Sequence, residues 1–183
     1  MKNKIVITLL IISVHSASLF AQPSPEVYKE KMKEFAFWEG RWRGEGSTQM
    51  GPGTAKKSTV DETLQFKLDG TVMLIEGMGT AIDPQTNQSQ VVHHAMAILS
   101  YDPPANQYKF QTYLKDGRST TAVLKIIEEK KYEWSFDVPN GKIRYLITID
   151  PIKKTWNEIG QYSNDNGSTW MKFFDMNLNK LED

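Results

Sequence analysis

Residues 35–46 read Phe-Ala-Phe-Trp-Glu-Gly-Arg-Trp-Arg-Gly-Glu-Gly, and this stretch indicates the fold of the chain. On a β-strand, alternate residues point to opposite faces. One face combines a single tryptophan with glycines: Gly40, Trp42, Gly44 and Gly46. The other face is charged: Arg41, Arg43 and Glu45. A large ring among residues without side chains indicates an anchor at the base of a barrel, with open space along the same wall. The alternative is a glycine-rich edge strand with one core tryptophan.

The segment from Phe37 to Trp42 (FWEGRW) resembles the Gly-x-Trp that opens the first strand of calycin-type barrels, such as lipocalins and fatty-acid-binding proteins. It is most similar to bacterial lipocalin-like domains that begin with an aromatic residue, a Gly-x-Trp and a glycine-rich strand. The resemblance covers about residues 35–180 and implies a barrel with an interior. It also implies a basic residue of the last strand lying across the ring of Trp42, a position that Lys172 can take.

Turn sequences separate segments of alternating polarity from about residue 56 onward. They lie at 68–70, 83–88, 102–106, 116–119, 129–131, 139–141, 150–153 and 164–168. Eight turns join nine strands, and the strand at Gly40 makes ten. The spacing predicts an all-β fold, an up-and-down antiparallel β-barrel of about ten strands, because closure removes exposed strand edges. A two-sheet β-sandwich is the alternative.

A short N-terminal helix is predicted over residues 25–36. Ser24 is a typical capping residue, and Pro25 suits the first helical position. Tyr28, Met32 and Phe35 recur at helical spacing. We therefore expect this helix to pack one apolar face on an end of the barrel.

The first 21 residues have the pattern of a secretory signal peptide. Two lysines precede an apolar run at 5–12, and small residues lead to Ala21, after which cleavage is predicted. The run is too short for a spanning helix. The domain assignment is therefore a signal peptide at 1–21 and a single barrel domain at 22–183, exported to the periplasm or the extracellular space.

The composition limits the partners of the protein. The 183-residue chain has no cysteine, so disulfides, thiolate chemistry and a lipid-modified cysteine are excluded. Removal of the signal peptide leaves 22 − 2 = 20 Lys+Arg against 22 Asp+Glu, a net charge of about −2. Such a balance gives no general attraction to nucleic acid or anionic lipid. We expect a small apolar molecule as the partner, no nucleic acid, and no integral membrane segment in the mature chain.

Four charged residues interrupt apolar rows that are candidates to line the interior: Glu62, Glu76, Glu158 and Lys172. A buried charge is costly unless it is paired or hydrogen-bonded, so such positions suit a binding site. Glu62 and Glu76 flank the turn at Asp69 and Gly70, and their spacing predicts that they lie close together on one face. The candidate ligand-binding residues are these four together with Trp42, Gly44 and Gly46.

Neither a metal nor a cofactor is expected. His93 and His94 are the only histidines after residue 21, and neighbours on a strand point to opposite faces, so one metal ion cannot readily bind both. Haem is the alternative that we considered. Some related barrels bind haem through a histidine near the C-terminal strands, where this chain has none.

Familiar catalytic motifs are missing, including the nucleophile elbow, the phosphate-binding loop, the zinc-protease motif and the dinucleotide fingerprint. No catalytic residue is assigned. The sequence predicts a secreted or periplasmic protein that binds a small, largely apolar ligand inside its barrel. One alternative is a barrel enzyme, an isomerase, lyase or hydrolase, with the interior carboxylates as general acid and base. Another is an interaction module whose barrel is packed.

Overall fold

A computed structural model describes residues 23–182. The predicted signal peptide at 1–21 lies outside the described residues. The strands are β1 (Gly40–Thr48), β2 (Lys56–Lys67), β3 (Val72–Ile82), β4 (Ser89–Asp102), β5 (Gln107–Leu114), β6 (Ser119–Glu128), β7 (Lys131–Val138), β8 (Gly141–Asp150), β9 (Thr155–Ser163) and β10 (Met171–Lys180). The helical elements are α1 (Pro25–Met32) and the short 3₁₀ segments η1 (Lys33–Trp38) and η2 (Leu68–Gly70).

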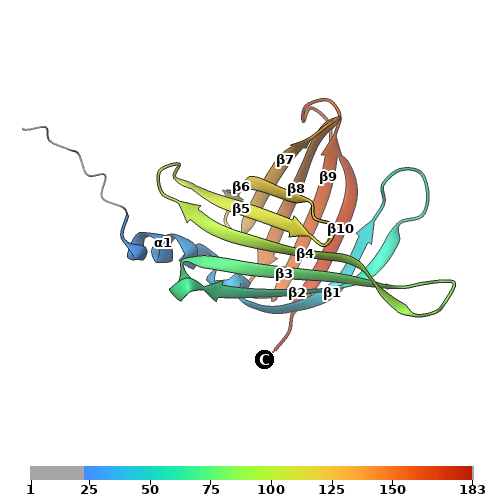
Figure 1. The fold of residues 1–183 in the computed structure, drawn as a ribbon, viewed down its shortest axis with the longest axis horizontal. Coiled ribbons are helices and arrows are strands. Elements are labelled where there is room, and N and C mark those ends of the chain that lie inside the picture. Colours follow the sequence, from blue (N-terminus) through green and yellow to red (C-terminus); the bar gives the residue numbers. More distant parts are fainter. Residues whose placement is uncertain (1–22, 183) are drawn as a thin grey trace, which may run out of the picture.

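The ten strands form one closed barrel (Figure 1). Each strand pairs antiparallel with its neighbours in sequence, and β1 also pairs with β10. This closure confirms the predicted up-and-down barrel and excludes the sandwich. Because β1 and β10 pair along their length, the first and last strands are hydrogen-bonded to each other and the sheet has no free edge.

The segment before β1 covers one end of the barrel (Figure 1). α1 has Pro25 at its start, where the missing N–H is not needed. The predicted helix at 25–36 is divided in two, because the α-helix ends at Met32 and the chain continues as a 3₁₀ turn to Trp38. Met32, Phe35 and Trp38 are fully buried, so this segment plugs the barrel. Across residues 23–182, no helix has both the length and the apolar character needed to cross a membrane.

The tightly packed core lies at this plugged end. Trp42 is 1% exposed, and its indole N–H donates to the carbonyl oxygen of Trp38 at 2.8 Å. Its ring meets Trp156 edge-on at 5.8 Å, and the ring of Trp38 meets Tyr132 at 5.0 Å. The tryptophan of the Gly-x-Trp segment is therefore the core anchor that the sequence predicts.

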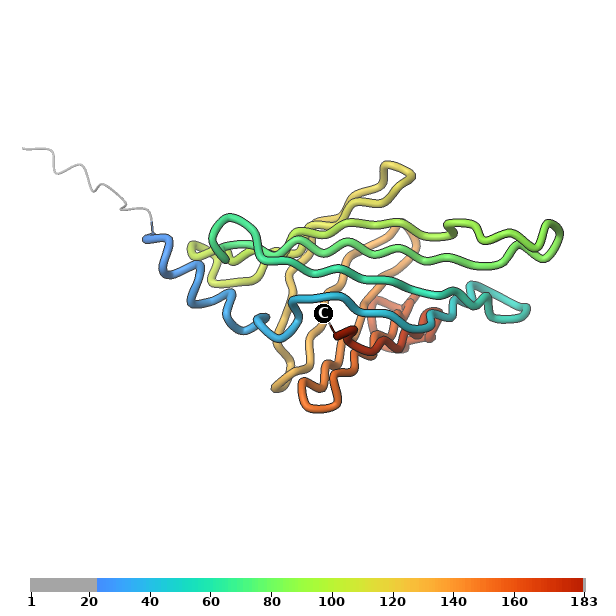
Figure 2. The backbone as a smooth tube through the Cα atoms, turned by 90° about the horizontal axis from the view of Figure 1, so that it is seen from below, coloured from blue at the N-terminus to red at the C-terminus, as the bar shows by residue number. Residues whose placement is uncertain are grey.

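The opposite end of the barrel is its mouth. It is formed by the connections at 49–55, 83–88, 115–118, 139–140 and 164–170. Figure 2 shows the β3–β4 hairpin, in green, reaching far beyond the barrel on the side away from α1. A ligand that enters the barrel must pass this end, because α1 and η1 cover the other.

Candidate functional site

Aromatic side chains line the mouth half of the interior, and we call them the aromatic layer. Its members are Phe110 on β5, Trp134 and Phe136 on β7, Tyr145 on β8 and Phe174 on β10. Phe110 is buried, whereas the other four are only partly buried although they point inward. At the plugged end, by contrast, Leu64 and Met73 are fully buried. Side chains of the interior are thus fully buried near α1 and retain some exposure toward the mouth.

The rings of the aromatic layer contact one another across the barrel. Trp134 stacks on Tyr145 with centroids 4.4 Å apart and lies 5.0 Å from Phe110. Tyr145 meets Phe174 edge-on at 6.1 Å over Gly160 of β9. A Cβ atom at Gly160 would lie 2.9 Å from both of these side chains, so the glycine is needed for the layer to form.

Gly44 and Gly46 do not leave open space, contrary to the sequence prediction. A Cβ atom at Gly44 would collide with the backbone carbonyl of Asn177, because β1 and β10 approach closely at this point. A Cβ atom at Gly46 would lie 2.9 Å from Cγ2 of Val60 and 3.8 Å from the ring of Phe174. The volume over both glycines is therefore filled by the barrel itself.

Two carboxyl groups lie between the aromatic layer and the packed core, Glu62 on β2 and Glu158 on β9. The carboxylate of Glu62 lies over Gly77, where a Cβ atom would be 2.7 Å from Oε2. Glu158 is 9% exposed. Burial raises the pKa of Glu62 to about 8, and the charges of Glu158 and Asp61 add to this effect. Burial also raises the pKa of Glu158, to about 7.

Hydrogen-bond donors surround Glu158. The indole N–H groups of Trp156 and Trp134 lie near its carboxyl and partly oppose the rise in its pKa. Both are buried, and neither reaches hydrogen-bonding geometry with an acceptor among the described residues. Burial raises the pKa of the Tyr145 hydroxyl beyond its ordinary range, and nearby Glu158 adds to that rise, so this hydroxyl stays protonated. The interior therefore holds polar groups whose hydrogen-bonding capacity is unused.

Glu76 lies on the outside of the barrel, so the predicted pairing of its carboxyl with that of Glu62 is wrong. Glu62 is opposite Gly77, and Glu76 is opposite Thr63. The connection runs from Leu68 to Thr71, four residues where the sequence predicts a three-residue turn at 68–70. A change of one residue in register moves a side chain to the other face of a sheet.

Lys172 also lies outside, where its Nζ contacts Oδ2 of Asp175 at 2.9 Å. A β-bulge at Phe173 shifts the register between Lys172 and Phe174, so the two no longer share a face. The predicted contact of Lys172 with Trp42 is therefore wrong.

The cation over Trp42 is Lys180, which the sequence analysis did not assign. Trp42 and Lys180 are directly opposite in the β1–β10 pair, and Nζ of Lys180 lies 5.5 Å from the ring centroid. The same ammonium group donates to the carbonyl oxygen of Phe37 at 3.1 Å. The contact between a basic residue of the last strand and the Trp42 ring was correctly predicted, but the lysine that makes it is Lys180 and not Lys172.

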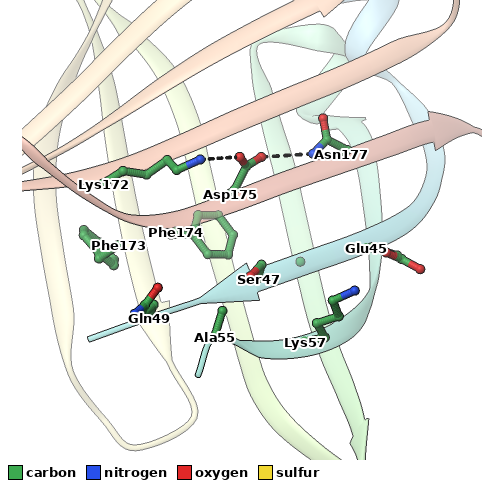
Figure 3. A pocket seen from close by; sticks show the side chains of 11 residues that line it. Glu45, Ser47, Gln49, Ala55, Lys57, Lys172, Phe173, Phe174, Asp175 and Asn177 are labelled. Atoms are coloured by element: carbon green, nitrogen blue, oxygen red, sulfur yellow. Dashed lines mark hydrogen bonds and ion pairs between the residues drawn. The ribbon is translucent and has the colours of Figure 1, made fainter. Parts of the chain in front are cut away.

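A groove of about 370 Å³ runs along the outside of β1 and β10 (Figure 3). Figure 3 shows Asp175 joined to Lys172 on one side and to Asn177 on the other, the latter at 3.0 Å. These side chains satisfy one another on a solvent-exposed face. Exposed ion pairs of this kind contribute little free energy, so the groove gives no specific chemistry.

His93 and His94 lie on β4 near the mouth, opposite Gly79 and Met78. Although the His93 side chain is exposed, partial desolvation lowers its pKa; nearby His94 and Arg118 act in the same direction, and Asp116 opposes them. In the part of the chain that the structure describes, no three His, Asp or Glu side chains form a group suited to a metal ion.

The fold and the site define a closed ten-stranded barrel with one buried acid, Glu158, and one half-buried acid, Glu62, beneath an aromatic layer. No protein-family model matches the sequence, and no curated protein matches it. Among solved structures, the chain is similar to the S-type phycobiliprotein lyase CPES from Guillardia theta, with a TM-score of 0.56 and 10% sequence identity over 88% of this chain and 99% of the lyase. At this identity, the similarity shows a shared fold and nothing more.

Proposed function

We propose that this protein is an exported binding protein that holds a small, largely apolar ligand in the mouth half of its barrel. One observation carries the proposal: partly exposed rings point inward above the buried Glu158, the half-buried Glu62 and buried indole N–H groups that have no hydrogen-bond acceptor among the described residues. Ligand pockets commonly combine an apolar wall with a few such polar groups. The barrel of the similar lyase supports this function only at the level of fold.

Binding can be tested with Nile red, a neutral apolar dye whose fluorescence rises in an apolar environment. We expect stoichiometric binding and energy transfer from the barrel tryptophans. Thr112→Phe adds a ring at an inward position of β5 and should weaken dye binding at least tenfold. Thr121→Phe is the matched control, because Thr121 is exposed on the adjacent strand β6. Equal loss in both variants, or no binding by the wild type, would contradict an interior site.

Native mass spectrometry of protein purified from its own host tests for a retained ligand. The same sample tests export, because the proposed cleavage after Ala21 gives a mature chain that begins at Gln22. We expect that N-terminus in the periplasmic or extracellular fraction. A chain that retains residues 1–21 would contradict the export proposal without affecting the binding proposal.

A barrel enzyme is the second candidate function, and the two interior carboxyls favour it. Near neutral pH, Glu62 with a pKa of about 8 holds its proton while Glu158 with a pKa of about 7 titrates. One acid and one base are therefore available close together. If mass spectrometry identifies a retained ligand, its conversion by the wild type but not by Glu62→Gln would support the enzyme. Return of the ligand unchanged from both would support the binding protein.

A further inference from the structure

We infer that the ligand carries a positively charged nitrogen at its inner end, held by Glu62 and Glu158 beneath the aromatic layer. This inference rests on the proposed function and specifies its ligand class as an apolar cation such as an aromatic amine.

The barrel supplies no cation to these acids. Neither carboxyl makes a hydrogen bond or an ion pair with another residue in the range 23–182 that meets ordinary geometry. The two lysines of β10 are engaged elsewhere, Lys172 outside with Asp175 and Lys180 with the carbonyl of Phe37. Buried carboxylates without a counter-ion are strongly disfavoured, so a ligand cation would satisfy a need that the protein leaves open.

The formal charges near the two acids favour a cationic ligand over an anionic one. The rings of Tyr145 on β8 and Trp134 on β7 stack on each other near Glu158, and the N–H edge of Trp134 is turned toward the carboxyl. The indole N–H groups of Trp134 and Trp156 act in favour of ionised Glu158. An anionic ligand would instead meet two acids, with no Lys or Arg side chain bonded to either.

Binding of a cation should release protons. Below about pH 7, both carboxyls hold protons in the free protein, because burial raises both pKa values. The titratable groups that face them inside the barrel are each other and the Tyr145 hydroxyl near Glu158. Asp61 acts on Glu62 in the same direction as Glu158, but it lies on the outer face of β2, paired with Arg43 at 3.2 Å. A bound cation favours the carboxylates and lowers both pKa values. Affinity should therefore rise as pH increases from about 6 to about 8, while the affinity of a neutral ligand should not change.

Three probes of similar shape test this inference: naphthylmethylamine, naphthylmethanol and naphthylacetate. Isothermal titration calorimetry of the purified protein at about pH 8, near the pKa of Glu62, should show the amine binding at least tenfold more tightly than the alcohol. Glu62→Gln and Glu158→Gln should each reduce this preference. Glu76→Gln is the matched control, because Glu76 is exposed on the outer face.

Proton release distinguishes a charge contact from a structural effect of these substitutions. Titrations near pH 6.5 in two buffers of different ionisation enthalpy should show release of about one proton or more with the amine and none with the alcohol. The release should decrease in Glu62→Gln.

Each remaining outcome has a defined meaning. If the alcohol binds, is weakened by Thr112→Phe, and matches the amine in affinity, the inference fails and the proposed function stands. If naphthylacetate binds most tightly, the inferred sign of the ligand charge is wrong. If none of the three probes binds although Nile red does, the inference fails and the proposed function stands; if Nile red does not bind either, both fail.

Discussion

Replacing Glu62 with glutamine should change how the stability of the protein depends on pH. The folded barrel holds this carboxyl protonated up to a pKa of about 8, whereas in the unfolded chain it ionises near 4.5. Between these values the folded state binds one proton more than the unfolded state. The free energy of unfolding must therefore fall as pH rises through this window. Glutamine has no proton to lose, so the free energy of unfolding of the variant should not show the part of the decrease that is due to Glu62.

The expected magnitude follows from the two pKa values. A difference between 4.5 and about 8 corresponds to about 5 kcal/mol at about 1.4 kcal/mol for each pKa unit. Glu158, whose pKa rises to about 7, adds about 3 kcal/mol on the same scale. Because the two carboxyls interact, removal of either also lowers the cost of ionising the other. A domain typically has a stability of about 5–15 kcal/mol, so the effect is large.

Urea unfolding followed by tryptophan fluorescence measures this effect at pH values from about 5 to about 9, the range that spans both transitions. The wild type should lose several kcal/mol over the range. Glu62→Gln should match it at the acidic end and exceed it by about 5 kcal/mol at the basic end. Glu76→Gln, on the outer face, should follow the wild type throughout.

The outcome that would refute this reasoning is a Glu62→Gln curve parallel to that of the wild type. Glu62 would then ionise at its ordinary pKa in the folded protein, which requires water or a cation at the carboxyl. If the decrease in the free energy of unfolding with pH disappears equally in Glu62→Gln and Glu76→Gln, the effect is due to the overall charge of the barrel.

Three further predictions concern the core and the barrel wall. Trp42→Ala should lower the free energy of unfolding by about 3–5 kcal/mol in urea titrations, because it empties a buried site; an unchanged midpoint would show that Trp42 is not a core anchor. Gly44→Ala should cost about 1–3 kcal/mol, because the new methyl group meets the backbone carbonyl of Asn177, whereas Gly77→Ala meets only the movable end of the Glu62 side chain and should cost clearly less; equal costs would contradict this difference. Lys180→Met should cost about 1–2 kcal/mol through the loss of its ring contact and hydrogen bond, while the exposed Lys172→Met should change stability by less than about 0.5 kcal/mol; the reverse order would restore the sequence-based assignment.

The fold could be predicted because its determinants are local. Turn residues mark where each strand ends, and the positive backbone φ of Asn87, Asn106 and Asn166 lies in three of the predicted turns. The glycine-rich strand around Trp42 is placed where the sequence indicates, at the start of the barrel. Up-and-down connectivity then follows, because a short connection can join only adjacent antiparallel strands.

The site was only partly predictable because a side chain's face depends on register. Glu62 and Glu158 were correctly included as interior candidates, since each belongs to an alternating row that contains a core residue. Glu76 and Lys172 were misplaced by one extra turn residue and one bulge, neither of which changes composition or periodicity visibly. Tyr145 was not assigned, because its strand is apolar on both faces and parity gives no direction there.

The cost in stability of Glu62 and Glu158 distinguishes a barrel that binds a ligand from one whose interior is only packed. A barrel that only fills its interior gains no stability from Glu62 and Glu158, because uncharged side chains of the same volume avoid the loss of stability that builds up as pH rises from about 4.5 to about 8. The remainder of the interior obeys ordinary packing, with fully buried apolar residues near α1 and glycines beneath the larger rings. Costly polar residues confined to one layer, here Glu62 and Glu158 below the aromatic layer, are expected where a protein loses stability in order to bind a ligand.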